Sequence, residues 1–130
     1  MVHYVDTSAL LKLVVDEAET PALLSWLDND DITPVSSDLT RTELMRAVRR
    51  AAPDEMTTAR RVLDGLVLIN LTTAIYHAAG RLDPDDLRSL DAIHLAAALH
   101  LGDDLEGLVT YDDRLTAAAK VSGVPVVAPR

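Results

Sequence analysis

The chain has 130 residues, of which 48% are hydrophobic, with a formal net charge of −9 and no cysteine. This length predicts one domain over residues 1–130, with an aliphatic core because phenylalanine is absent. The lack of cysteine excludes disulfides and thiolate metal sites, and the acidic balance argues against a generic nucleic-acid coat. No apolar run approaches the ~20 residues of a membrane span and the start is no signal peptide, so we expect a cytoplasmic protein without a membrane partner.

Short apolar runs that favour strands alternate along the chain with stretches of helical periodicity. The expected strands cover residues 2–5, 32–36, 66–71, 107–111 and 124–127. The expected helices cover about 9–15, 20–28, 39–52, 55–64, 73–82, 89–101 and 113–121. This alternation implies right-handed crossovers and a parallel sheet that helices cover on both faces, and Pro125 suggests that the last strand lies at a sheet edge.

Asp6, Thr7 and Ser8 form the junction between the first strand and the first helix. The hydroxyl of Thr7 or Ser8 can cap that helix, which would leave the Asp6 carboxylate free. In open parallel sheets, ligands bind at the carboxyl ends of the strands, and Asp6 stands at such an end. Asp6 is therefore either a helix cap or a member of a site.

Asp91 is the only Asp, Glu, Lys or Arg between Ser89 and Gly102, in a helix rich in leucine and alanine. A helix that is apolar on nearly every side is buried. A carboxylate on it faces a desolvation cost of roughly several kcal/mol unless a charged partner or a cation compensates. The alternative is that Asp91 only stabilises the positive end of the helix dipole.

Asp112 follows its strand as Asp6 follows the first one, so the two carboxylates can be neighbours at one sheet edge. Either Asp112 or Asp113 can cap the next helix while the other points into a site. Glu43 fits the capping-box pattern that begins at Thr40, in which the glutamate folds back to the cap amide. It also lies one position from the apolar stripe of its helix, so it could reach inward instead.

Four carboxylates in one place would repel each other, because two unit charges at 4 Å cost about 4 kcal/mol at an effective dielectric constant near 20. Such a cluster is tolerable if it raises its own pKa values or binds a cation. Oxygen ligands without cysteine suit Mg²⁺ or Mn²⁺. Mg²⁺ takes only one or two carboxylates directly and keeps several waters, an arrangement that supports attack of water on a phosphodiester.

Half of the twelve basic residues are arginines within residues 41–61. This cluster is either a solvated helix face or a surface that contacts phosphates or a partner. Its members are Arg41, Arg46, Arg49, Arg50, Arg60 and Arg61. His94 and His100 have no partners at a recognisable ligand spacing, so we expect them to be packing or surface residues and not metal ligands.

Four sequence blocks, in order along nearly the whole chain, resemble those of PIN-domain proteins and, more narrowly, of VapC-type toxins from toxin–antitoxin pairs. The blocks are Val5-Asp6-Thr7-Ser8-Ala9-Leu10, Glu43-Leu44, Leu90 to Ala98 and Val109 to Leu115. The resemblance implies an α/β fold, a three-layer α/β/α sandwich with a parallel sheet of about five strands. It also implies a Mg²⁺- or Mn²⁺-dependent endoribonuclease, in which a metal-activated water hydrolyses the RNA phosphodiester.

By position, the family's acidic quartet corresponds to Asp6, Glu43, Asp91 and Asp112. The first and third of these match the usual direct metal ligands, and the other two match acids that complete the site, directly or through water. The doubled Asp112-Asp113 leaves open which of the two is the fourth acid, so Asp113 is a further candidate ligand. Small hydroxyl residues that orient the carboxylates correspond to Thr7, Ser8 and Thr110.

The resemblance further implies a substrate of exposed single-stranded loops in structured RNA such as tRNA or rRNA. It implies a homodimer and a small VapB-like antitoxin whose tail occupies the acidic groove. The candidate RNA contacts are Arg114, Arg41, Arg46, Arg49 and Arg50.

Two other classes remain alternatives. A haloacid-dehalogenase-like phosphatase or a receiver domain would form an aspartyl-phosphate on Asp6, but Ser8 stands where the phosphatase has its second aspartate, and the last strand offers no receiver lysine. The other alternative is a non-catalytic acidic binding module, against which the intact quartet argues.

Overall fold

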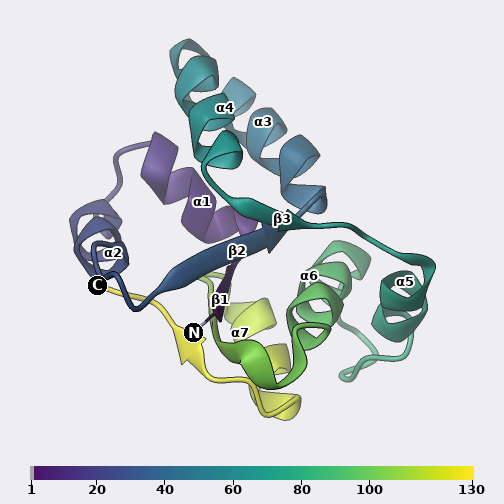
Figure 1. The fold of residues 1–130 in the computed structure, drawn as a ribbon. Helices are drawn as coiled ribbons and strands as arrows, with labels where there is room; N and C mark the ends of the chain where they lie inside the picture. The colour runs from purple at the N-terminus through teal and green to yellow at the C-terminus, as the bar shows by residue number, and fades with distance from the viewer. Residues whose placement is uncertain (1) are drawn as a thin grey trace.

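The structure is a computed structural model that describes residues 2–130. Five parallel strands form one sheet in the order β3-β2-β1-β4-β5 (Figure 1). The strands are β1 Val2–Val5, β2 Thr33–Ser37, β3 Val67–Ile69, β4 Leu105–Val109 and β5 Val126–Val127. The helices are α1 Thr7–Val14, α2 Thr20–Leu27, α3 Leu39–Ala51, α4 Met56–Asp64, α5 Thr73–Ala79, α6 Ser89–Leu99 and α7 Asp113–Val121, with short 3₁₀ turns η1 Pro53–Glu55 and η2 Gly102–Asp104.

Helices cover both faces of the sheet, and each face has its own buried cluster (Figure 1). Successive residues of a strand point to opposite faces. Tyr4 of β1 and Leu108 of β4 therefore pack under α5, α6 and α7, whereas Val5 and Val109 pack under α1 to α4. The three-layer α/β/α sandwich with a five-stranded parallel sheet is confirmed.

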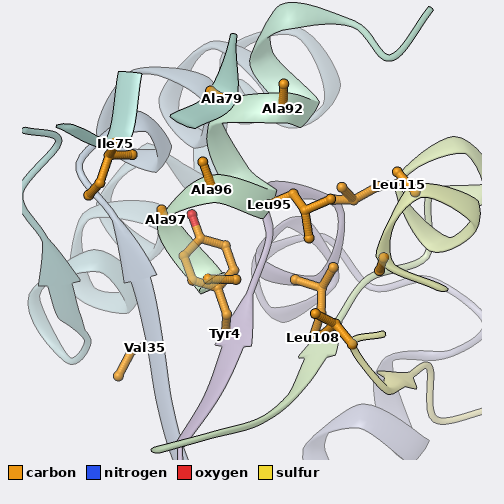
Figure 2. Close-up of a cluster of buried hydrophobic side chains, with 14 residues drawn as sticks. Tyr4, Val35, Ile75, Ala79, Ala92, Leu95, Ala96, Ala97, Leu108 and Leu115 are labelled. Carbon is orange, nitrogen blue, oxygen red and sulfur yellow. The ribbon is translucent and has the colours of Figure 1, made fainter. Parts of the chain in front are cut away.

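The helix α6 lies close to the sheet because its inner face is built largely from alanine. Figure 2 shows Ala96 and Ala97 beside the ring of Tyr4, which rises from β1 with its hydroxyl end toward α6. These alanines and Tyr4 are almost completely buried. Small side chains on the helix thus leave room for one large aromatic side chain from the sheet.

Proline in two strands fits the strand order. Pro34 lies in β2, an inner strand, but β3 pairs only with Val35 to Ser37, so Pro34 has a strand neighbour on one side alone. Proline has no N–H group to donate to a neighbouring strand, so an inner strand tolerates it only where one side is unpaired, as here. The strand after Pro125 is β5, and it lies at the sheet edge as the sequence predicts.

The carboxyl ends of β1, β2 and β4 bring three helix starts together. The Asp6 amide donates to the Val109 carbonyl at 3.1 Å, so the chain leaves β1 and β4 side by side. Beyond these strand ends α1 and α7 begin, and α3 begins just after β2. Carboxylates near these helix starts can therefore face one another. They do so at the carboxyl ends of the strands, where a parallel sheet of this kind is expected to carry its site.

No helix among residues 2–130 has both the length and the apolar character needed to cross a membrane.

Candidate active site

Asp6 is buried where β1 meets α1 and accepts three hydrogen bonds. The Ser8 hydroxyl (2.7 Å) and the Ala9 amide (3.0 Å) donate to its Oδ1, and the Thr110 hydroxyl (2.6 Å) donates to its Oδ2. The prediction that Thr7 or Ser8 caps α1 is wrong, because Asp6 caps the helix itself. Burial raises the pKa of the Asp6 carboxyl, while the hydrogen bonds from Thr110 and Ser8 oppose that rise.

The same two hydroxyls join the turn after β1 to the turn after β4. The Tyr111 amide donates to Ser8 Oγ at 3.0 Å, and the Asp112 amide donates to Thr110 Oγ1 at 3.1 Å. Each hydroxyl thus accepts a hydrogen bond from a backbone amide in the turn after β4 and donates one to the Asp6 carboxylate. This network fixes the position of Asp6 relative to the backbone of Asp112.

The Glu43 side chain extends from α3 to Thr7 of α1 and His94 of α6, and its Oε1 accepts two hydrogen bonds. Thr7 Oγ1 donates at 2.7 Å, and His94 Nε2 lies 2.5 Å away. The capping-box alternative for Glu43 is wrong, because the Thr40 hydroxyl donates to the Ser37 carbonyl and α3 has no side-chain cap. Burial raises the pKa of Glu43, but the hydrogen bond and the charge of His94, together with the hydrogen bond from Thr7, outweigh burial and hold it below its usual value.

His94 has a larger part in the site than the sequence suggests. It is buried, with 3% of its surface exposed, and both ring nitrogens have partners: Glu43 at Nε2 and the Tyr4 hydroxyl, 2.8 Å away, at Nδ1. The expectation of a packing or surface residue misses these contacts. Its spacing is the usable signal, because His94 lies three residues after Asp91 and so on the same flank of α6. His100, by contrast, lies exposed at the end of that helix.

Asp91 lies in the first turn of α6 and is only half-buried. The prediction of a helix buried on nearly every side fails at this end, where Leu90 is 49% exposed. Within the part of the chain that the structure describes, Asp91 accepts no side-chain hydrogen bond and forms no ion pair. Burial raises the pKa of Asp91, and the negative charges of Asp112, Asp6 and Glu43 raise it further against a smaller opposing effect of His94.

Asp112 caps α7, since its Oδ1 accepts from the Leu115 amide at 2.8 Å. Asp113 is the first residue of α7 and is exposed. Both line a surface hollow of about 340 Å³ together with Asp91. The electrostatic coupling to Asp91 involves Asp112, so the capping residue is also the one that belongs to the acidic cluster.

The four carboxylates keep oxygen lone pairs free for a ligand. A carboxylate has about four acceptor positions. Asp6 uses three of them and Glu43 uses two, both on Oε1, so Glu43 Oε2 is open. Asp112 uses one position, and Asp91 uses none.

Oxygen donors of this kind suit a hard divalent cation. Among residues 2–130, no three histidine, aspartate or glutamate side chains are arranged to enclose a metal ion by themselves. Water and substrate oxygens would have to complete the coordination, which is the arrangement Mg²⁺ favours. The donor set therefore fits a divalent ion held by few direct protein ligands.

Two arginines line the same hollow as Asp91 and Asp112. Arg88 stands immediately before α6, and Arg114 is the second residue of α7. Both are exposed, and neither pairs with a carboxylate of residues 2–130. Arg114 is predicted from the sequence as an RNA contact, whereas Arg88 is not, although its position three residues before Asp91 places it on the same side of the start of α6.

The other candidate RNA contacts are exposed residues of α3 that do not line this hollow. They are Arg41, Arg46, Arg49 and Arg50. Arg41 forms an ion pair with Asp38, with its Nε 2.8 Å from Oδ1.

The PIN domain family matches residues 3–121 of the chain. Two relatives in Mycobacterium tuberculosis, named Ribonuclease VapC46 and Ribonuclease VapC47, are 45% and 42% identical to it, with 97% of this chain and 96% of each relative covered. The solved structure of Mycobacterium tuberculosis VapC20, titled a Sarcin-Ricin loop cleaving toxin, has 18% identity and a TM-score of 0.78 over 98% of this chain and 99% of that one. A toxin–antitoxin complex from Klebsiella pneumoniae has 25% identity and a TM-score of 0.73, with 98% of each chain covered.

The chain therefore belongs to the PIN-domain family. Within that family it is a ribonuclease of the VapC type, the class of its relatives at 42–45% identity. This membership decides against the phosphatase, receiver and non-catalytic alternatives.

Proposed function

We propose that this VapC-type ribonuclease cleaves internal phosphodiester bonds of RNA with Mg²⁺ or Mn²⁺ held at the four clustered carboxylates. Asp6 and Asp91 would bind the ion directly, and Glu43 and Asp112 directly or through water, whereas the other candidate ligand, Asp113, stands at the rim of the hollow and is not needed to hold the ion. The observation that carries the proposal is the open acceptor position on each of the four acids, combined with the raised pKa of Asp91 beside three like charges.

The bound ion would activate a water molecule and stabilise the negative charge that develops on the phosphorus centre. The protein's own part is to hold oxygen atoms in place before the substrate arrives. Ser8 and Thr110 fix Asp6, and Thr7 and His94 fix Glu43. Asp91 and Asp112 stand at the open hollow, where they face the substrate.

Arg88 and Arg114 hold the RNA phosphates next to the bond that is cleaved. Both guanidinium groups line the hollow beside Asp91 and Asp112 without a carboxylate partner, so their donors remain available. Guanidinium groups match phosphate geometry through paired N–H donors. Their position counters the repulsion between an acidic protein and a polyanion.

Arg46 and Arg50 extend this contact along α3. They lie three and seven residues after Glu43 and therefore on its flank of the helix, with Arg50 about 10 Å further along the axis. Arg49 and Arg41 lie on other sides of α3, and Arg41 is already paired with Asp38. We rank Arg46 and Arg50 above these two as contacts for RNA that extends beyond the hollow.

The substrate we propose is an exposed single-stranded loop of a structured RNA, such as tRNA or rRNA, whose unpaired bases a small open site can reach. The protein acts as a homodimer in the cytoplasm. A small VapB-like antitoxin neutralises it by placing a basic side chain among the carboxylates, where its charge replaces that of the ion. The structural similarity to a chain from a toxin–antitoxin complex supports such a partner.

The test is expression of the protein in cells with mapping of new RNA 5′ ends, wild type against Asp91→Asn. We expect discrete new ends with the wild type and none with the variant, and purified protein should require Mg²⁺ or Mn²⁺ for the same cleavage. Equal cleavage by a folded Asp91→Asn protein, or full cleavage in excess EDTA, would contradict the proposal.

A further inference from the structure

A continuous chain of buried side chains runs from the sheet to Glu43. The Tyr4 hydroxyl donates to Ser37 Oγ at 2.8 Å and lies 2.8 Å from His94 Nδ1. His94 Nε2 then lies 2.5 Å from Glu43 Oε1, to which Thr7 also donates. The chain links β2, β1, α6, α3 and α1, so it spans both helical layers of the fold.

Solvent cannot replace a lost partner along most of this chain. Tyr4 and Ser37 are completely buried, and His94 is 3% exposed. A buried donor or acceptor that loses its partner costs more than the bond contributes when made. The Tyr4 ring itself is fixed among the side chains that α6 and the sheet contribute to the core (Figure 2), so its hydroxyl is a fixed point for the His94 ring.

Glu43 needs such support because of its side chain and its surroundings. It is a long side chain with 23% of its surface exposed. The negative charge of Asp91 is coupled electrostatically to that of Glu43 and also to that of Asp6. With Thr7 as its sole donor, Glu43 could turn away from these like charges toward solvent, which would relieve repulsion and return rotamer entropy.

We propose that His94 is a positioning residue of the nuclease. Its Nε2–H holds Glu43 Oε1 so that Oε2 faces the metal site, and Tyr4 holds the imidazole ring in that orientation. The inference rests on the proposed function only in taking Glu43 as part of that site. His94 plays this part for Glu43 and not for Asp6, whose hydrogen-bond donors are Ser8, Ala9 and Thr110.

Two amide substitutions separate the two ends of the imidazole. In His94→Gln the amide nitrogen reaches about as far as Nε2, so donation to Glu43 can persist while the contact to Tyr4 is lost. In His94→Asn the shorter amide stays near Nδ1, so the Tyr4 contact can persist while Glu43 loses its donor. The two variants have closely similar polarity and burial, and His100→Asn on the exposed end of α6 is the control for the helix.

The measurements are the kcat and KM for a short RNA, the Kd for Mn²⁺ by calorimetry and the melting temperature. Loss of an outer partner of a metal ligand typically costs 10- to 100-fold in affinity or activity. We therefore expect His94→Asn to lower kcat and weaken Mn²⁺ binding by about that factor, with KM changed less than kcat. His94→Gln should stay within about 5-fold of the wild type, and His100→Asn should match it. Tyr4→Phe should give an intermediate loss.

Equal losses in the Gln and Asn variants, in proportion to their melting temperatures, would overturn the proposal and leave His94 as a packing residue. If the Asp91→Asn protein cleaves RNA as well as the wild type, the nuclease site itself is wrongly assigned. In that case crystal structures of the two His94 variants decide the inference alone. Glu43 displaced in the Asn variant and retained in the Gln variant supports it, and any other pattern contradicts it.

Discussion

The acidic site has two halves that are held in different ways. Glu43 and Asp6 are anchored by protein groups, with two hydrogen bonds on Glu43 and three on Asp6. At the open hollow, Asp112 accepts one capping bond and Asp91 accepts no side-chain bond from residues 2–130. The anchored half is preorganised, whereas the open half keeps its oxygens for what enters the hollow.

One acid from each half, Glu43 and Asp91, shows the difference in its pKa, whereas burial raises the pKa of Asp6 in the anchored half as well. The hydrogen bond and charge of His94 and the hydrogen bond from Thr7 keep the pKa of Glu43 low in spite of burial, so that carboxylate is already stabilised as an anion. Burial and like charges raise the pKa of Asp91, so its negative charge lacks a partner. Because charge without compensation is costly, the open half is where a cation would contribute most to stability and where its removal would matter most.

The largest expected effect comes from a matched pair in the open half, Asp112→Asn and Asp113→Asn. Asparagine can still cap α7, so both proteins should fold. Loss of the Asp112 charge should lower kcat by about 10²- to 10³-fold, since a metal ligand or its water partner is worth several kcal/mol in the transition state. Asp113→Asn should stay within about 3-fold.

Steady-state cleavage of one RNA at fixed Mn²⁺ measures both variants. The reverse order, with Asp113→Asn the weaker enzyme, would assign the fourth acid to Asp113 and contradict the coupling between Asp112 and Asp91.

In the anchored half, Thr110→Val removes a donor to Asp6 without changing the size of the side chain. The Asp6 carboxylate then loses a 2.6 Å hydrogen bond in a buried place. We expect kcat to fall about 10- to 100-fold and the free energy of unfolding to fall by about 1–3 kcal/mol. Urea unfolding and cleavage assays measure the two effects, with Thr57→Val on the exposed face of α4 as the control. Unchanged kcat would show that the anchored half needs no support from the turn after β4.

The arginines of the hollow should give a smaller effect of a different kind. Arg88→Ala and Arg114→Ala each remove one phosphate contact, so KM should rise several-fold with kcat nearly unchanged. The slope of log affinity against log salt should become shallower by about 1 for each arginine. Fluorescence binding to labelled RNA in the Asp91→Asn background measures the salt dependence of affinity without cleavage. Arg61→Ala on the exposed face of α4 is the control. An unchanged slope in both variants would remove these arginines from the RNA contact.

The smallest expected effect is a gain in stability. Because the pKa of Asp91 is raised by folding, ionised Asp91 opposes folding at neutral pH, and this cost disappears as pH falls and the carboxyl becomes protonated in both states. Asp91→Asn should therefore raise the melting temperature at pH 7 by about 3 °C, a small gain because Asp91 is half-exposed and screened by solvent. The difference should shrink toward pH 4. A variant less stable than the wild type at pH 7 would contradict the unpaired state of Asp91.

Much of the fold follows from local sequence. The alternation of apolar strands and amphipathic helices predicts the parallel sheet, and Asp6 and Asp112 meet because their strands are neighbours. Capping was harder to predict, because Asp6 is both cap and site residue and its hydroxyl neighbours serve as donors to carboxylates. Local patterns contain no information on which of two nearby side chains the fold turns inward.

Contacts between distant segments account for what the sequence does not reveal. His94 and Glu43 are 51 residues apart and meet because α3 and α6 lie on opposite faces of the sheet and approach each other past its edge. Tyr4 reaches His94 across 90 residues because α6 covers the face of the sheet to which the Tyr4 side chain points. The half-exposed position of Asp91 goes with an exposed start of α6, where Ser89 and Leu90 also reach solvent, and composition cannot show which end of an apolar helix is exposed.

The most direct test of the central claim, that the anchored and open halves form one cation site, is a crystal structure of the protein with Mn²⁺ and its anomalous signal. The account predicts a single dominant peak about 2 Å from an oxygen of Asp6 and an oxygen of Asp91, with Glu43 and Asp112 within reach directly or through water. A peak away from these carboxylates, or none at a Mn²⁺ concentration that supports cleavage, would contradict it.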